Sequence, residues 1–288
     1  MNNKEEIKLI DTYELAYNCL RDNKRTNLFK KAILEVVSQN DIVMEVGTGT
    51  GILSMFASQK NPKIVYSVEI SEYLCNLATR IIKKNKLDLK VKTINENGIN
   101  KTIIKSKRVD VLIMELMSIG LISEMQVPVF NSLLSKGVID SKSKIIPAEY
   151  TSFLELANIN YKMYGYDFRI VQHEQPWFES QVKEILSDKA EYSKVDFNKA
   201  LATGVAVDPV IDKEIELEII QTGMINGIVI SGLIKLSPGV ELDRTQYLNN
   251  PIIIPIEDIM VNRGEKIKLH LKYQMGDGVD SLTADIVR

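Results

Sequence analysis

The stretch IVMEVGTGTGILSMFAS, residues 42–58, decides the fold of this chain. A short apolar run rich in β-branched residues leads into a loop that contains three glycines. Apolar residues then recur at the spacing of a helix. A buried strand that turns through a glycine loop into a helix is the opening unit of a parallel α/β sheet, because glycine permits the tight turn between the two elements.

Strand-like and helix-like segments alternate around that unit. We expect helices over residues 26–37 and 71–87, the second capped by Ser71, and strands at 64–70, 89–95 and 109–115. Strands separated by helix-sized segments predict a Rossmann-like, mostly parallel sheet with helices on both faces, the fold class α/β. We place this first domain at residues 1–147.

The pattern changes after about Pro147. Alternation of apolar and polar residues with period two predicts an antiparallel β-barrel or sandwich over residues 148–288. Asn226-Gly227 predicts a hairpin turn inside MINGIVISGLIKL. The stretch 165–193 is less regular, and we expect it to be partly helical.

The composition argues against several classes of protein. Lys and Arg total 36 against 38 Asp and Glu, a net charge of −2 without the basic stripe of a nucleic-acid binder. Cys19 and Cys75 show no metal-ligand spacing, so we expect no metal site, no disulfide framework and a reducing cytoplasm. The first residues lack a signal-peptide core, and no apolar run reaches the roughly 20 residues that span a bilayer, so we expect no membrane partner.

Two cofactor classes use a glycine loop in this position. The dinucleotide fingerprint requires a closing glycine or alanine, and the two possible registers end at Ile52 and Ser54 instead. The tighter G-x-G-x-G after an acid is similar to the loop that binds S-adenosyl-L-methionine. Glu69 follows Gly51 by 18 residues at the end of the second strand, where a carboxylate accepts ribose hydroxyls of either cofactor. A glycine-rich turn without a ligand is the remaining alternative.

The segment IMELMSIGLISEM, residues 113–125, places two carboxylates, Glu115 and Glu124, among apolar and uncharged residues. Carboxylates are seldom buried unless they are paired. Either both acids lie at a solvated edge or a cation comes to meet them. Glu115 stands at the carboxyl end of the fourth expected strand, where α/β proteins bind their ligands.

Together these segments resemble the protein arginine methyltransferase family, from roughly Leu20 to Phe168. VDVLIMELMSIGLISE is similar to the family's double-E hairpin, in which a second glutamate follows the first by nine residues, as Glu124 follows Glu115. The resemblance implies transfer of a methyl group from S-adenosyl-L-methionine to a guanidino group, with Glu115 and Glu124 as the catalytic pair. Its acceptor would be a peptide, a protein or a small molecule that bears the guanidino group.

The same resemblance implies a set of cofactor-binding residues. Arg25 matches an arginine that meets the cofactor carboxylate, and Glu69 holds the acidic ribose position. The whole set comprises Arg25, Glu45, Gly47, Thr48, Gly49, Gly51, Glu69, Ile70, Gly98 and Ile99.

A physical argument connects the two glutamates with a guanidinium. This cation presents five donors in a planar fork and stays protonated, so two carboxylates can hold it through charge-assisted hydrogen bonds. Methyl transfer then depends mainly on the position of a weak nucleophile. Two alternatives stay open: a methyltransferase for an amine, amide or hydroxyl of a small molecule or biosynthetic peptide, and a non-catalytic cofactor-binding module. A module of that second kind has no need of both glutamates.

Some positions depart from the family pattern. Leu116 replaces the usual tryptophan and Ser118 the usual glycine, while Thr245-Gln246-Tyr247 is the nearest copy of a Thr-His-Trp loop that helps to form the substrate pocket. The identity of the acceptor is therefore open. Trp177 lies where the family inserts a dimerisation arm, here near residues 168–195, so a homodimer is one expected assembly.

Overall fold

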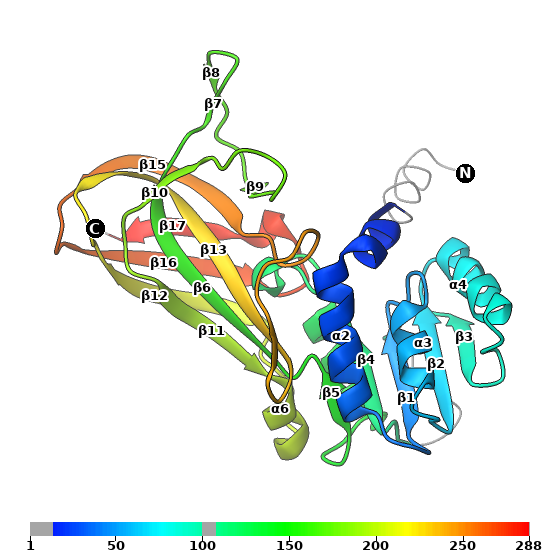
Figure 1. Cartoon of the computed structure of the whole chain (residues 1–288). Helices are drawn as coiled ribbons and strands as arrows, with labels where there is room; N and C mark the ends of the chain where they lie inside the picture. The colour runs from blue at the N-terminus through cyan, green and yellow to red at the C-terminus, as the bar shows by residue number, and fades with distance from the viewer. Residues whose placement is uncertain (1–13, 100–107, 288) are drawn as a thin grey trace.

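The computed structural model describes residues 14–99 and 108–287. A parallel sheet with helices forms one side of the molecule, and long antiparallel strands extend from it on the other side (Figure 1). This arrangement confirms the predicted fold class.

The parallel sheet has five strands in the order β3-β2-β1-β4-β5. Their bounds are β1 Ile42–Val46, β2 Ile64–Glu69, β3 Val91–Asn95, β4 Val111–Met114 and β5 Lys144–Ile146. The helices around it are α2 Asn23–Val36, α3 Ile52–Ser58, α4 Glu72–Lys84 and α5 Gln126–Ser135. Because all pairs within the sheet are parallel, the carboxyl ends of the strands meet at one edge.

Helix caps fix two of these helices. Ser71 Oγ accepts a hydrogen bond from the Leu74 backbone N–H at 3.3 Å and starts α4 as predicted. Asp22 caps α2 in the same way, since its Oδ1 accepts from the backbone N–H of Arg25 at 3.1 Å. The second cap also places Arg25 in the first turn of α2, beside the carboxyl edge of the sheet.

The antiparallel half contains a seven-stranded and a three-stranded sheet, of which the second has the order β12-β16-β17. The strands of the larger sheet are β6 Glu149–Ile159, β9 Gln172–His173, β10 Val182–Ile185, β11 Ala190–Asp196, β13 Gly223–Ser237, β14 Val240–Leu242 and β15 Ile252–Val261. The smaller sheet has β12 Val210–Glu218, β16 Lys266–Gln274 and β17 Thr283–Val287, while β7 Lys162–Met163 and β8 Tyr166–Asp167 form a separate hairpin and α6 spans Phe197–Thr203.

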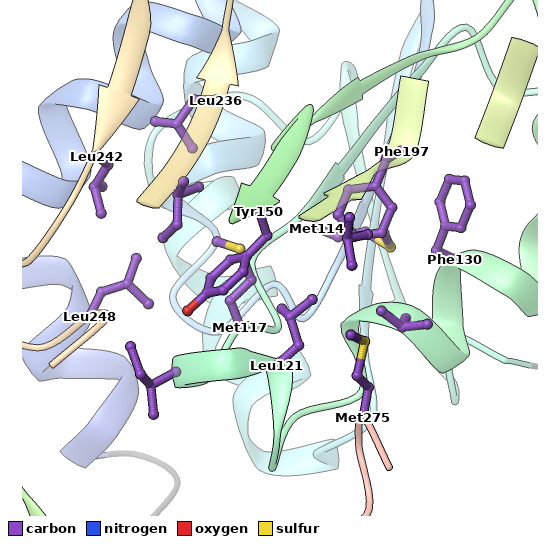
Figure 2. Packing of buried hydrophobic residues seen from close by; sticks show 14 of the residues in the cluster. Met114, Met117, Leu121, Phe130, Tyr150, Phe197, Leu236, Leu242, Leu248 and Met275 are labelled. Carbon is purple, nitrogen blue, oxygen red and sulfur yellow. The ribbon is translucent and has the colours of Figure 1, made fainter. Parts of the chain in front are cut away.

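The two halves share one hydrophobic core. Met114 and Leu121 from the α/β half pack with Tyr150, Phe197 and other buried side chains of the β half in a single cluster (Figure 2). Strand β5 ends at Ile146 and β6 begins at Glu149, so the boundary placed at 147 falls between the two sheets. A shared core means that the β half directly supports the segment that follows β4.

The hairpin predicted at Asn226-Gly227 is wrong, because β13 continues straight through it. The strand has a bulge between Ile225 and Gly227, and the Asn226 side chain bonds to the backbone of Ile159 on β6. Asn226 Oδ1 accepts from Ile159 N at 2.7 Å, and Asn226 Nδ2 donates to Ile159 O at 3.1 Å. The amide therefore replaces a backbone partner at the bulge, which local turn statistics do not detect.

The expectation of helix in residues 165–193 is also wrong. This stretch holds β8, β9, β10 and the start of β11, and no helix forms in it. Strands β10 and β11 both pair with β6, so tertiary pairing determines their structure. The part that projects from the molecule is β7 and β8 with the segment around β9, which lies before β10 (Figure 1).

Within residues 14–99 and 108–287, no helix is long and apolar enough to cross a membrane. The same residues hold no group of three or more His, Cys, Asp or Glu side chains arranged to bind a metal ion.

Candidate active site

A cavity opens at the carboxyl ends of β1, β2 and β4. Residues 15–20, which belong to a helical segment before α2, cover one side of it, and Tyr247 and Leu248 from the β half reach it from another. Nine residues expected from the sequence line it: Arg25, Glu45, Gly47, Thr48, Gly49, Glu69, Ile70, Glu115 and Glu124.

The glycine loop leaves β1 with positive φ angles at Gly47, Gly49 and Gly51, of 80°, 52° and 85°. The backbone N–H groups of Gly47 and Thr48 both donate to Val68 O on β2, at 3.0 and 3.1 Å. A Cβ on Gly47 would lie 2.5 Å from Leu116 Cδ2, so only glycine fits both the turn and the approach of the next loop.

Glu45 braces this loop from beneath. Its side chain is buried and accepts hydrogen bonds from Thr48 Oγ1 at 2.9 Å, from Ser54 N at 3.0 Å and from Ser54 Oγ. Burial raises the pKa of the Glu45 carboxyl to about 7, although the hydrogen bonds donated by Ser54 and Thr48 lower it. Glu45 thus connects the loop to the first turn of α3.

Glu69 ends β2 and turns its carboxylate toward the loop. The backbone N–H groups of Gly49 and Ser71 donate to its two oxygens, each at 2.9 Å. Each carboxylate oxygen has further lone pairs, so Glu69 retains acceptor capacity for hydroxyl groups. Ile70 beside it lines the cavity and is 68% exposed.

Arg25 is buried, with 4% of its surface exposed, and forms an ion pair with Glu115 through Nη2. Its Nη1 donates to the backbone carbonyl of Cys19 at 3.2 Å. Its Nε has no hydrogen-bond partner among the described residues, although the atom is buried. An unpaired, buried guanidinium N–H beside a cavity is complementary to a carboxylate ligand.

Glu115 and Glu124 stand at the two ends of one loop. Glu115 follows β4, and Glu124 precedes α5 by two residues. The loop contains a 3-10 turn over Ile119–Leu121. The segment that resembles the double-E hairpin is therefore a compact loop here and not two paired strands. Ser118 Oγ accepts from the backbone N–H groups of Ser123 and Glu124, at 2.7 and 3.2 Å, which closes the loop on itself.

Glu115 and Glu124 share a neighbouring cation, Arg25. Glu115 is paired with Arg25, whereas burial and the Glu115 carboxylate raise the pKa of Glu124 to about 8, with Arg25 opposing the shift. Burial and Glu115 also raise the pKa of the Cys19 thiol to about 12, so Cys19 is no nucleophile at neutral pH. Glu124 is therefore mostly protonated at neutral pH, and a cation beside it would favour its ionised form.

Three residues expected at the site do not line the cavity. Gly51 lies against α4, where a Cβ would meet Ile82 and Ala78 at 3.4 and 3.5 Å. Gly98 packs under β1, since its Cβ would lie 2.4 Å from Val46 Cγ1. The Ile99 carbonyl instead accepts from Ser132 Oγ at 3.1 Å and so holds α5 in place.

Sequence reasoning missed most of the cavity wall that lies outside the glycine loop. Leu15, Ala16, Cys19 and Leu20 line it at helical spacing, a signal that the sequence carries. Tyr247 comes from the loop that departs from the family pattern, and its backbone N–H donates to Asp22 Oδ2 at 2.8 Å. The Trp177 ring covers Tyr247, with ring centroids 5.1 Å apart.

A family model places the chain by sequence. The ribosomal protein L11 methyltransferase (PrmA) model matches residues 22–184, more than half of the chain. The chain belongs to this methyltransferase family. The chain is an S-adenosylmethionine-dependent methyltransferase.

Relatives of this methyltransferase fall into two groups. An uncharacterized protein of Methanocaldococcus jannaschii is 31% identical over 270 residues, 94% of this chain and 95% of the relative. Protein arginine N-methyltransferase 6 of Xenopus tropicalis is 37% identical over 111 residues, 38% of this chain and 32% of that protein. The likeness to the named enzyme therefore concerns only part of each chain.

Solved structures share the fold over most of the chain. The Trypanosoma brucei PRMT1 enzyme-prozyme heterotetrameric complex with AdoHcy has a TM-score of 0.72 at 19% identity, over 93% of this chain and 92% of that chain. A crystal structure of PRMT6 with SAH has a TM-score of 0.68 at 16% identity, over 93% and 97% of the two chains.

S-adenosyl-L-methionine is the cofactor of this methyltransferase. The residues of the cavity fit it: the unpaired Nε–H of Arg25 suits a carboxylate, and Glu69 suits ribose hydroxyls. When bound, the cofactor supplies an electrophilic methyl group on its sulfonium.

Proposed function

We propose that this methyltransferase acts on a guanidino nitrogen, in a protein or peptide arginine, free arginine or an arginine-derived metabolite. The observation that carries the proposal is the pair Glu115 and Glu124 at the carboxyl end of β4, in the same cavity as the glycine loop. One of these carboxylates already binds a guanidinium, that of Arg25, so its surroundings tolerate this planar cation.

The charge of the site supports a cationic acceptor. Burial, and after it the Glu115 carboxylate, raises the pKa of Glu124 to about 8, so ionising both glutamates near neutral pH requires a further cation. A guanidinium between the carboxylates would lower that pKa and stabilise both carboxylates in their ionised form. A neutral hydroxyl or amide acceptor would supply no charge to offset a second buried carboxylate.

Each residue of the proposed site then has a separate task. Arg25 and Glu69 hold the carboxylate and the ribose of the cofactor, and the backbone of residues 47–49 lets the cofactor approach closely. Glu115 and Glu124 orient the acceptor nitrogen through bidentate bonds. The proton lost from that nitrogen passes to one of the two glutamates or to water.

The likeness to protein arginine N-methyltransferase 6 supports this proposal, because it covers part of the chain at 37% identity. Three residues depart from the arginine methyltransferase pattern: Leu116, Ser118 and Tyr247. They favour an acceptor whose groups next to the guanidino group differ from those of a protein arginine. An amine, amide or hydroxyl acceptor is the second candidate, since the cavity is lined by Tyr247, whose ring packs against Trp177, where the family pattern has a different residue.

Methyl-labelled S-adenosyl-L-methionine tests the proposal with a panel of arginine, arginine peptides, agmatine and a cell extract. We expect label on a guanidino nitrogen, located by fragmentation mass spectrometry. The Glu184→Gln variant, which changes an exposed glutamate on β10, is the matched control for changes at the two glutamates. Label on amines or hydroxyls alone would contradict the proposal and favour the second candidate.

We also propose that the arm expected near residues 168–195, together with the hairpin of β7 and β8 before it, pairs two copies of the chain. It exposes large apolar side chains, among them Tyr164 at 96%, Tyr166 at 72% and Phe178 at 72%. Large apolar side chains exposed along one projecting segment fit an interface better than a solvated surface. We expect light scattering to show a dimer of the unmodified chain and a monomer of the double variant Tyr166→Ser with Phe178→Ser. Leu89→Ser is the control, because Leu89 is 91% exposed and lies outside this segment, and it should remain a dimer. A monomeric unmodified chain would refute this.

A further inference from the structure

Gly120 lies at the apex of the loop between Glu115 and Glu124, with φ at 62°. Tyrosine hydroxyls bind both of its backbone polar groups. Tyr150 Oη accepts from Gly120 N at 2.9 Å, and Tyr273 Oη donates to Gly120 O at 2.8 Å. The loop that carries the two acids is thus held at its midpoint by side chains from outside the α/β half.

The tyrosines come from three strands in both sheets of the β half. Tyr150 is on β6, Tyr192 on β11 and Tyr273 on β16, and all three are buried. Tyr192 Oη lies 3.0 Å from Tyr273 Oη, so the third hydroxyl supports the second. Figure 2 shows Tyr150 beside Met117 and Leu121 of the loop.

The contact around Gly120 is tight. A Cβ at this position would lie 3.0 Å from Tyr192 Oη and 3.2 Å from the Ile122 side chain. Together with the positive φ, this closeness favours glycine over larger residues. The loop therefore fits in one position among the tyrosines. A shift of Gly120 would break its two buried hydrogen bonds, to Tyr150 and Tyr273, at once.

The same network reaches the opposite wall of the cavity. Tyr150 Oη donates to Asn249 Oδ1 at 2.7 Å, and Asn249 Nδ2 donates to the carbonyls of Gly232 and Asp243, at 2.7 and 2.8 Å. Asn249 belongs to the segment that carries Tyr247. One hydroxyl thus connects the loop of the two acids with the wall on the acceptor side.

We propose that Tyr150, Tyr192 and Tyr273, the tyrosine clamp, are positioning residues that fix the geometry of Glu115 and Glu124 toward the acceptor. This inference rests on the proposed function of the two glutamates. The clamp touches neither acceptor nor cofactor; it acts through Gly120. The β half then contributes to the reaction by holding a loop of the other half in place.

Tyr150→Phe and Tyr273→Phe test the clamp, since each removes one hydroxyl bound to Gly120. Tyr161→Phe is the matched control, because Tyr161 is an equally buried β-half tyrosine whose hydroxyl donates to the Asn226 carbonyl at 3.3 Å. We expect faster hydrogen exchange in residues 115–125 and a fall in kcat of about tenfold or more in the two clamp variants. The Kd for S-adenosylhomocysteine should stay within about twofold, because the glycine loop is held separately.

The pH profile separates positioning from general loss of stability. Glu115, Arg25 and Cys19 face Glu124, and a loosened loop would separate Glu124 from Glu115 and hydrate it. The midpoint of kcat/KM against pH should therefore move to lower pH in the clamp variants and stay in place in Tyr161→Phe. Should Tyr150→Phe not fold, Tyr273→Phe alone gives the comparison.

Exchange, kcat and pH midpoint equal to those of Tyr161→Phe would overturn the clamp. Failure of the proposed function is distinguishable, because it would show as no guanidino methylation by the unmodified chain. Hydrogen exchange needs no acceptor, so unchanged protection of residues 115–125 in both clamp variants would refute the clamp even then.

Discussion

The glycine loop and the loop between Glu115 and Glu124 follow neighbouring strands, β1 and β4, and face the same cavity. The first is held from within its own half, by Glu45, Ser54 and the Val68 carbonyl. The second is held at Gly120 by tyrosines of the β half. We therefore expect the cofactor side of the site, at the glycine loop, to be a local structure, and the proposed acceptor side, at the loop of the two acids, to depend on both halves.

The largest effect should come from Glu115→Gln, which would break the acceptor side alone. Loss of one carboxylate should reduce methyl transfer by about 100- to 1,000-fold, because the guanidinium loses a bidentate partner. Calorimetric titration should show that S-adenosylhomocysteine still binds. Activity equal to that of Glu184→Gln would remove Glu115 from the reaction.

Arg25→Ala should disturb both sides, since Arg25 pairs with Glu115 and has an N–H left for the cofactor. We expect the Kd for S-adenosylhomocysteine to rise about 10- to 100-fold, the range of a lost charge-assisted contact. Lys24→Ala is a suitable control, because the neighbouring Lys24 is exposed and pairs with Asp243. An unchanged Kd in Arg25→Ala would show that the cofactor carboxylate binds elsewhere.

Gly47→Ala tests a place where the two loops approach each other closely. The added Cβ would collide with Leu116 Cδ2 and also strain the positive φ, so cofactor affinity and Tm should both fall. Gly239→Ala has a similar φ of 76° and open space, so it measures the backbone strain alone. Leu116→Ala should restore part of the affinity in the Gly47→Ala background; no rescue would mean that the contact does not matter.

The smallest effect should appear in the pH dependence of kcat/KM. Glu124 must be ionised to hold a guanidinium, and its pKa in the acceptor-free protein is raised to about 8. A raised pKa leaves the acid mostly protonated below that pH, so kcat/KM should increase as pH rises through about 8. A profile that is flat from pH 6 to 9 would contradict this role for Glu124.

The two loops also differ in how well the sequence predicts them. The strand, the turn and helix α3 around Gly47 depend on residues within 42–58, and the structure has these elements where the pattern indicates. The spacing of Glu115 and Glu124 is likewise visible in the sequence. Tyr150, Tyr273 and Asn226 act on partners far along the chain, so no local period reveals their hydrogen bonds.

Proton release on acceptor binding tests the central claim most directly. An arginine peptide is titrated into the protein with S-adenosylhomocysteine at pH 7, by calorimetry in two buffers of different ionisation enthalpy. If a guanidinium enters between Glu115 and Glu124, the pKa of Glu124 falls from about 8 and binding releases a proton, which Glu124→Gln abolishes. Binding of the peptide with no proton released, or equal release from Glu124→Gln, would contradict the account.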